Sequence, residues 1–120
     1  MPTITLPDGR TLDAPEGKRL VLALEDAGVD ILHRCGGYAK CTTCRVSFSS
    51  GEPARMTVAE RNRLADGGLI GQVRLSCQIP CDHDMTLKTV NRLTGTDYSD
   101  VGSRPEDSIT PTPQWVDRPT

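Results

Sequence analysis

Residues 35–44 read CGGYAKCTTC and contain three of the five cysteines of this 120-residue chain, at Cys35, Cys41 and Cys44. A fourth, Cys77, follows 33 residues after Cys44 inside the sequence LSCQI. Thiolates held this close in sequence form a soft ligand set, which suits zinc, copper(I) or an iron–sulfur cluster better than magnesium or calcium. The stretch therefore predicts a metal centre around which the rest of the chain folds.

Length and composition indicate one small domain without a membrane span. The chain is long enough for one domain but not two, and its 36% hydrophobic and 3% aromatic residues make a thin core that a metal centre would help to stabilise. No apolar run approaches the roughly 18 residues of a membrane-spanning helix. Residues 1–5, MPTIT, lack the basic and apolar regions of a secretory signal. Because five cysteines cannot complete a disulfide framework, we expect a soluble cytoplasmic protein whose cysteines bind metal.

The weak acidity of the chain is concentrated near its C-terminus. The formal net charge is −2, of which residues 1–95 contribute +1 and residues 96–120 contribute −3. Residues 96–120 are also rich in Pro, Ser, Thr and Asp, a composition that cannot bury enough apolar surface to fold alone. We therefore predict a domain over 1–95 followed by a tail over 96–120. Nothing in the chain is basic enough to suggest a nucleic-acid partner.

Hydrophobic periodicity predicts an α+β arrangement. Leu20, Ala23, Leu24 and Ala27 share one helical face, and Gly28 is suited to end that helix. The predicted strands lie over 3–6, 11–14, 45–49, 73–76 and 85–90, the first two of them paired, and the predicted helices over 18–27 and 58–65. The second helix has Thr57 as its N-cap and Glu60 three residues later, the spacing of a capping box. Together they predict a sheet packed on one main helix.

Two motifs carry a resemblance to a known family. The sequence Cys35-Gly-Gly, followed by Cys41-Thr-Thr-Cys44-Arg-Val and, later, by residues 74–79, RLSCQI, closely resembles the [2Fe–2S] ferredoxins of β-grasp fold. The resemblance covers roughly residues 3–93. Five residues separate the first two cysteines, where plant-type ferredoxins have four. This gap resembles that of the adrenodoxin-like and related bacterial ferredoxins.

The resemblance implies both a fold and a function. The fold would be a β-grasp, with a mixed sheet of about four to five strands on one main helix, a cluster-binding loop and a short second helix. Cys35 and Cys41 would bind one iron of a [2Fe–2S] cluster, and Cys44 and Cys77 the other. The protein would be a soluble, monomeric carrier, not an enzyme, that moves single electrons between a ferredoxin reductase and an acceptor oxidoreductase.

The residues alone leave one alternative open, a structural zinc site with the same four cysteines. Zinc ribbons usually contain two Cys-x2-Cys pairs, whereas this chain has one, and Cys81 completes only a looser Cys-x3-Cys. Cys81 is interpreted as a small buried or half-buried residue. His33 and His83 lack the paired Cys-x-His units of a Rieske site, and we interpret both as surface or hydrogen-bonded residues.

Several expectations concern the surface. The loop around the cysteines carries Arg34, Lys40 and Arg45 without an acidic residue, which predicts a docking face for an acidic or apolar partner patch and a potential above the roughly −400 mV of plant-type ferredoxins. The helix over 58–65 is expected to expose a mixed charged face. Trp115 is expected to anchor the tail. For Tyr38, shielding of the cluster and simple exposure stay equally open.

Overall fold

The computed structural model describes residues 2–7, 9–29, 44–89, 108–109 and 112–117. Its main sheet has five strands in the order β2-β1-β6-β3-β5. These strands are β1 (Thr3–Thr5), β2 (Thr11–Asp13), β3 (Arg45–Ser50), β5 (Arg74–Leu75) and β6 (Met85–Thr89). β1 pairs with β6 in parallel and the other neighbours are antiparallel, so the sheet is mixed, as predicted.

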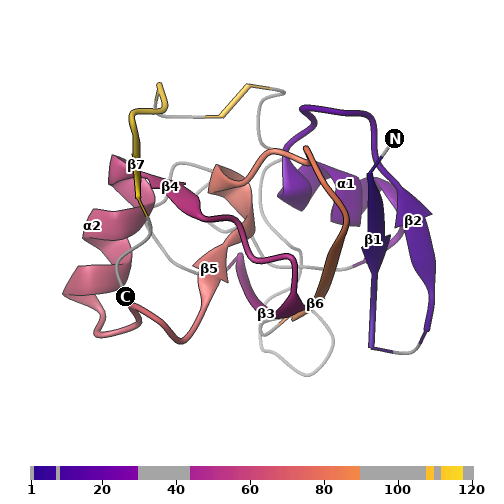
Figure 1. The fold of residues 1–120 in the computed structure, drawn as a ribbon, viewed down its shortest axis with the longest axis horizontal. Coiled ribbons are helices and arrows are strands. Elements are labelled where there is room, and N and C mark those ends of the chain that lie inside the picture. Colours follow the sequence, from indigo (N-terminus) through magenta and orange to yellow (C-terminus); the bar gives the residue numbers. More distant parts are fainter. Residues whose placement is uncertain (1, 8, 30–43, 90–107, 110–111, 118–120) are drawn as a thin grey trace, which may run out of the picture.

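The main helix, α1 (Leu20–Asp26), contributes five consecutive buried residues, Leu20 to Leu24, to the core. These residues form one apolar cluster with side chains from β1, β3, β5 and β6. Figure 1 shows α1 beside the β1–β2 hairpin, with the second helix at the opposite end of the molecule. The β-grasp-like α+β class is therefore confirmed.

The first turn of the predicted helix is not helical. Arg19 has extended backbone angles (φ −61°, ψ 135°) and forms an isolated bridge with Pro80. Cys81 donates its N–H to the Lys18 carbonyl oxygen at 2.7 Å, and this bond also draws the segment before α1 toward residues 79–81. At the other end, Gly28 has a φ of +87° and ends the helix as predicted.

The second helix, α2 (Val58–Asp66), begins as its sequence predicts. The Thr57 hydroxyl oxygen accepts the Glu60 N–H at 3.1 Å, which satisfies one of the free donors of the first turn. The expected solvated face is wrong at Glu60, whose side chain is fully buried. Its carboxylate accepts hydrogen bonds from Arg74 Nε at 2.8 Å, Arg74 Nη2 at 3.1 Å and the Leu75 N–H at 2.8 Å, so α2 is tied to β5.

A second, two-stranded sheet was not predicted. β4 (Arg55–Thr57) pairs antiparallel with β7 (Trp115–Asp117), and the Val58 N–H donates to the Gln114 carbonyl oxygen at 2.8 Å. Part of the predicted tail therefore pairs with the domain, as Figure 1 shows beside α2. The predicted boundary at residue 95 lies in 90–107, outside the described residues.

Candidate metal centre

Two of the predicted ligands lie at the same end of the β3–β5 pair. Cys44 directly precedes β3, and Cys77 lies in a 3-10 turn, η1 (Ser76–Gln78), directly after β5. Arg45 pairs with Leu75 in the antiparallel register, and the Cys44 carbonyl oxygen accepts both the Ser76 N–H at 3.0 Å and the Ser76 hydroxyl at 2.8 Å. The register therefore brings the two cysteines, 33 residues apart in sequence, to one place.

Both of these cysteines are buried. Cys44 is 2% exposed and Cys77 has no exposed surface. Cys35 and Cys41 belong to 30–43, outside the described residues, as do His33, Arg34, Tyr38 and Lys40. Within the described ranges, no group of three or more His, Cys, Asp or Glu side chains is placed to hold a metal ion. Of the four predicted ligands, the described residues therefore include Cys44 and Cys77.

A hydrogen-bond donor faces the Cys77 sulfur. Gln78 Nε2 lies 3.6 Å from Cys77 Sγ, and the Thr57 hydroxyl donates to Gln78 Oε1 at 2.8 Å. With the amide oxygen bonded to Thr57, the NH2 group of Gln78 faces the sulfur. A donor at this position favours a thiolate over a thiol and offsets part of the desolvation of a buried anionic group. The donor set therefore fits a thiolate-ligated cluster.

The backbone of Cys77 is held by a buried cation. Arg19 donates to the Cys77 carbonyl oxygen from Nε at 3.0 Å and from Nη2 at 2.7 Å, and its side chain is fully buried. Sequence reasoning missed Arg19, which it placed on a predicted helix without a role. It also gave no role to Gln78, although this residue directly follows a predicted ligand.

The fifth cysteine has a different environment. Cys81 is fully buried, which confirms the interpretation of a small buried residue. Burial, followed by the negative charge of Asp82, raises the pKa of its thiol to about 12, and Lys18 opposes this shift. The raised pKa favours the thiol form of Cys81 in the metal-free chain.

His83 is a hydrogen-bonded residue near the surface, as predicted. Its Nε2 lies 2.7 Å from the Gly51 carbonyl oxygen and its Nδ1 lies 2.5 Å from Asp82 Oδ1. The hydrogen bond to Gly51 is the largest cause of a raised His83 pKa; Asp82 and Asp84 add to it, and burial opposes it. Gly51 itself has a φ of +76°, and a Cβ there would lie 2.5 Å from the Asp84 carbonyl oxygen, so this close approach requires glycine.

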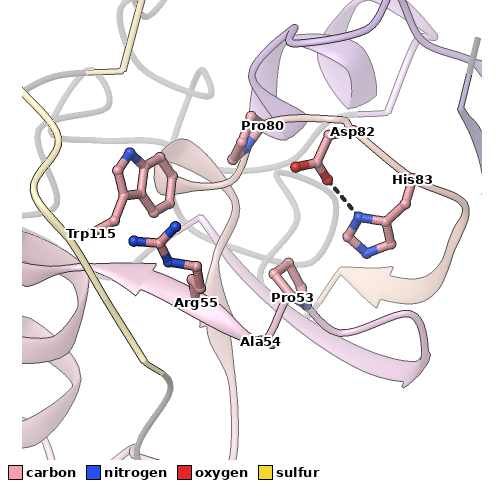
Figure 2. A pocket seen from close by; sticks show the side chains of 7 residues that line it. All are labelled: Pro53, Ala54, Arg55, Pro80, Asp82, His83 and Trp115. Carbon is pink, nitrogen blue, oxygen red and sulfur yellow. Dashed lines mark hydrogen bonds and ion pairs between the residues drawn. The ribbon is translucent and has the colours of Figure 1, made fainter.

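A surface cavity of about 350 Å³ lies beside this histidine. Figure 2 shows Trp115 and Arg55 on one side of it and Asp82 and His83 on the other, and none of the described cysteines lines it. Trp115 is 37% exposed, and the β7 residue packed against the core is Val116. The expectation of Trp115 as the anchor is therefore wrong, because its side chain lies at the cavity while its neighbour faces the core.

No helix among the described residues is both long and apolar enough to cross a membrane. The main sheet on α1, and two buried cysteines at the end of the β3–β5 pair, agree with the fold that the cysteine motifs predict.

Comparison with known proteins identifies the family. Residues 4–82 match the model of the 2Fe-2S iron-sulfur cluster binding domain, and the chain therefore belongs to this family. Rhodocoxin of Rhodococcus erythropolis is 35% identical over 95 residues, which cover 71% of this chain and 89% of rhodocoxin. A component of the Na(+)-translocating NADH-quinone reductase of Chlamydia felis is 36% identical over 90 residues, but the chain spans only 20% of the length of that relative.

Solved structures agree with this assignment. The ISC-like [2Fe-2S] ferredoxin of Pseudomonas putida JCM 20004 is 27% identical, with a TM-score of 0.63 over 80% of this chain and 99% of the ferredoxin. A covalent putidaredoxin reductase–putidaredoxin complex contains a chain that is 27% identical, with a TM-score of 0.55 over 75% of this chain and 99% of that one. Residues 4–82 thus form a domain of the 2Fe-2S iron-sulfur cluster binding family, with the fold of these ferredoxins.

Proposed function

We propose that this chain takes single electrons from a ferredoxin reductase and delivers them to an acceptor oxidoreductase. Cys35, Cys41, Cys44 and Cys77 are the proposed cluster ligands. The observation that carries the proposal is the placement of Cys44 and Cys77, both buried, at one end of the β3–β5 pair, with a side-chain donor at the Cys77 sulfur. The cluster, when bound, supplies a one-electron redox couple.

The chain's own residues give this cluster a fixed environment. Ser76 holds the Cys44 carbonyl, Arg19 holds the Cys77 carbonyl, and Gln78 donates to the Cys77 sulfur. A donor to a ligating sulfur, as Gln78 would be, stabilises the more negative, reduced state of a cluster and so tunes its potential. A carrier that only stores and passes an electron needs four protein ligands and no general base, so a non-enzymatic role is proposed. The proposed compartment is the cytoplasm.

A reductase is the proposed donor because one structural relative is solved as a putidaredoxin reductase–putidaredoxin complex and another relative is named as part of a reductase. The proposed contact face is the cysteine loop, where Arg45 is half-buried at the start of β3. The second candidate face contains two exposed residues, Asp82, which lines the cavity at His83, and Asp84. The two faces have opposite charge, so they predict opposite effects of charge reversal on electron-transfer rate.

Single Cys→Ser variants test the ligand assignment. Each of Cys35→Ser, Cys41→Ser, Cys44→Ser and Cys77→Ser is expected to lose or alter the visible absorption and the iron and sulfide content. Cys81→Ser is the matched control and is expected to keep full colour, because Cys81 lies outside the two cysteine motifs that predict the ligand set. A Cys81→Ser protein that bleaches while Cys35→Ser stays red-brown would refute the assignment. A colourless protein with one zinc per chain after anaerobic purification would refute the electron-carrier proposal itself.

A further inference from the structure

Arg19 is an arginine whose side chain has no exposed surface. It lies at the N-cap position of α1, where its extended backbone bridges to Pro80 and the next residue, Leu20, donates its N–H to the Ile79 carbonyl oxygen at 2.8 Å. Burial of a guanidinium is unfavourable unless its donors are satisfied. The acceptors of these N–H groups therefore explain why the guanidinium is buried in the domain.

Two of its N–H groups converge on one backbone oxygen. Nε and Nη2 donate to the Cys77 carbonyl oxygen at 3.0 and 2.7 Å. A charged donor makes a stronger hydrogen bond than a neutral one, and two donors from one rigid plane fix direction as well as distance. The carbonyl belongs to the proposed ligand itself, so fixing it fixes the backbone from which the Cys77 sulfur extends.

The third donor reaches a different part of the chain. Arg19 Nη1 donates to the Ser108 carbonyl oxygen at 3.1 Å, 89 residues away in sequence. One guanidinium thus connects the C-terminal segment with the proposed cluster ligand. Lysine could not do this, because an ammonium is a single point donor on a flexible stem.

A second connection reaches Cys77 from the same C-terminal segment. Trp115 of β7 pairs with Thr57 of β4. The Thr57 hydroxyl donates to Gln78 Oε1 at 2.8 Å, and Gln78 Nε2 faces Cys77 Sγ at 3.6 Å. The carbonyl of Cys77 is therefore linked to Ser108 through Arg19, and its sulfur is linked to β7 through Gln78 and β4.

We propose that Arg19 is a positioning residue for the cluster ligand Cys77, and that through it the C-terminal segment at Ser108 helps to set the reduction potential of the cluster. The inference rests on Cys77 being a ligand, as proposed above. Loss of the buried cation and of its two bonds to the Cys77 carbonyl disfavours the more negative, reduced cluster. The potential is therefore expected to fall.

The test compares Arg19→Gln and Arg19→Lys with Lys88→Gln in the full-length, cluster-loaded protein. Lys88 is an exposed residue of β6, so Lys88→Gln controls for loss of one positive charge at the surface. Redox titration followed by visible absorption, and visible circular dichroism, are the readouts. Arg19→Gln is expected to lower the potential and change the dichroism, Arg19→Lys to do so less, and Lys88→Gln to leave both unchanged.

Amide hydrogen exchange tests the link to the C-terminal segment. Without the bond from Arg19 Nη1 to Ser108, the Val58 N–H, which is bonded to Gln114, is expected to exchange faster in Arg19→Gln. Amides of the β3–β6 pair serve as the internal control and are expected to keep their rates. Unchanged exchange at Val58 together with an unchanged potential would overturn the link to the segment.

The same variants show whether Arg19 positions Cys77 or only stabilises the fold. If Arg19→Gln lowers only the melting temperature and leaves potential and dichroism as they were, Arg19 is structural and the proposal is wrong. If Arg19→Gln does not hold the cluster, Arg19→Lys decides by the same two readouts. Cys77→Ser, measured in parallel, separates the two proposals: full colour in that variant refutes the ligand assignment, whereas bleaching there with an unchanged Arg19→Gln refutes the Arg19 proposal alone.

Discussion

Replacement of Glu60 by Ala is expected to destabilise the fold strongly, although α2 lies outside the cysteine motifs. The Glu60 side chain is fully buried and that of Arg74 is 4% exposed, with 2.8 Å between Arg74 Nε and Glu60 Oε2. Glu60 also accepts the Leu75 N–H at 2.8 Å. Removing Glu60 takes from the buried Arg74 its nearest carboxylate and leaves only the more distant, partly exposed Glu52; loss of one partner of a buried pair typically costs about 3–5 kcal/mol. For a chain of this size, that loss corresponds to a fall in Tm of roughly 10–25 °C.

Glu52→Ala is the matched control. Glu52 Oε2 lies 3.4 Å from Arg74 Nη1, and its side chain is 34% exposed, so solvent screening reduces its contribution to about 1 kcal/mol or less. Thermal unfolding of the cluster-loaded protein, followed by far-ultraviolet circular dichroism, measures both variants. A Glu60→Ala protein that melts within a few degrees of Glu52→Ala would refute the reasoning, because it would show that the buried pair can be opened without penalty.

Other contacts give three further predictions. Gln78→Leu should keep the cluster but lower its potential by roughly 40 mV or less, the one-electron equivalent of about 1 kcal/mol for one hydrogen bond, with Gln72→Leu as an exposed control in redox titration. Because the folded-state pKa of His83 is raised, its stabilising contribution should be complete below the unfolded pKa of about 6.5 and disappear as pH rises through the folded pKa. The Tm should therefore fall over this pH range in the parent protein and lose that step in His83→Asn. An unchanged step in His83→Asn would assign the pH dependence to another group. Deletion of residues 97–120 should leave a coloured domain of lower Tm, since β7 and the Ser108 acceptor are removed; complete loss of the cluster would show that the segment belongs to the domain.

Local sequence signals predicted the elements whose cause is local. Thr57 caps α2, and Gly28 ends α1, because each acts on backbone groups within a few residues. The first turn of α1 was mispredicted because residues 18 and 19 bond instead to residues 79–81, some 60 positions away. Likewise, β7 has only three residues, and its pairing with β4 depends on tertiary placement rather than on its own pattern.

The candidate site divides in the same way. The cysteine spacing predicts a metal centre, and the register of β3 and β5 places Cys44 and Cys77 at the same end of that pair; Cys35 and Cys41 lie outside the described residues. Burial of Glu60 could not be predicted, because its partner Arg74 is 14 residues away and each looks like an ordinary surface charge in sequence. The role of Arg19 was equally hidden, since its acceptors lie 58 and 89 residues further along the chain.

These long-range bonds explain how Cys77, the proposed ligand, is held in place after a strand of only two residues. Residues 74–78, which contain β5 and η1, are each fixed by a partner from elsewhere. Glu60 binds the Arg74 side chain and the Leu75 N–H, Ser76 is bonded to Cys44, Arg19 holds the Cys77 carbonyl, and Thr57 holds Gln78. The partners come from α2, the end of β4, the residue before β3 and the residue before α1, so the geometry at Cys77 depends on the whole domain being folded. We therefore expect the proposed ligand to change its position little between two redox states, which is the property that a one-electron carrier requires of its site.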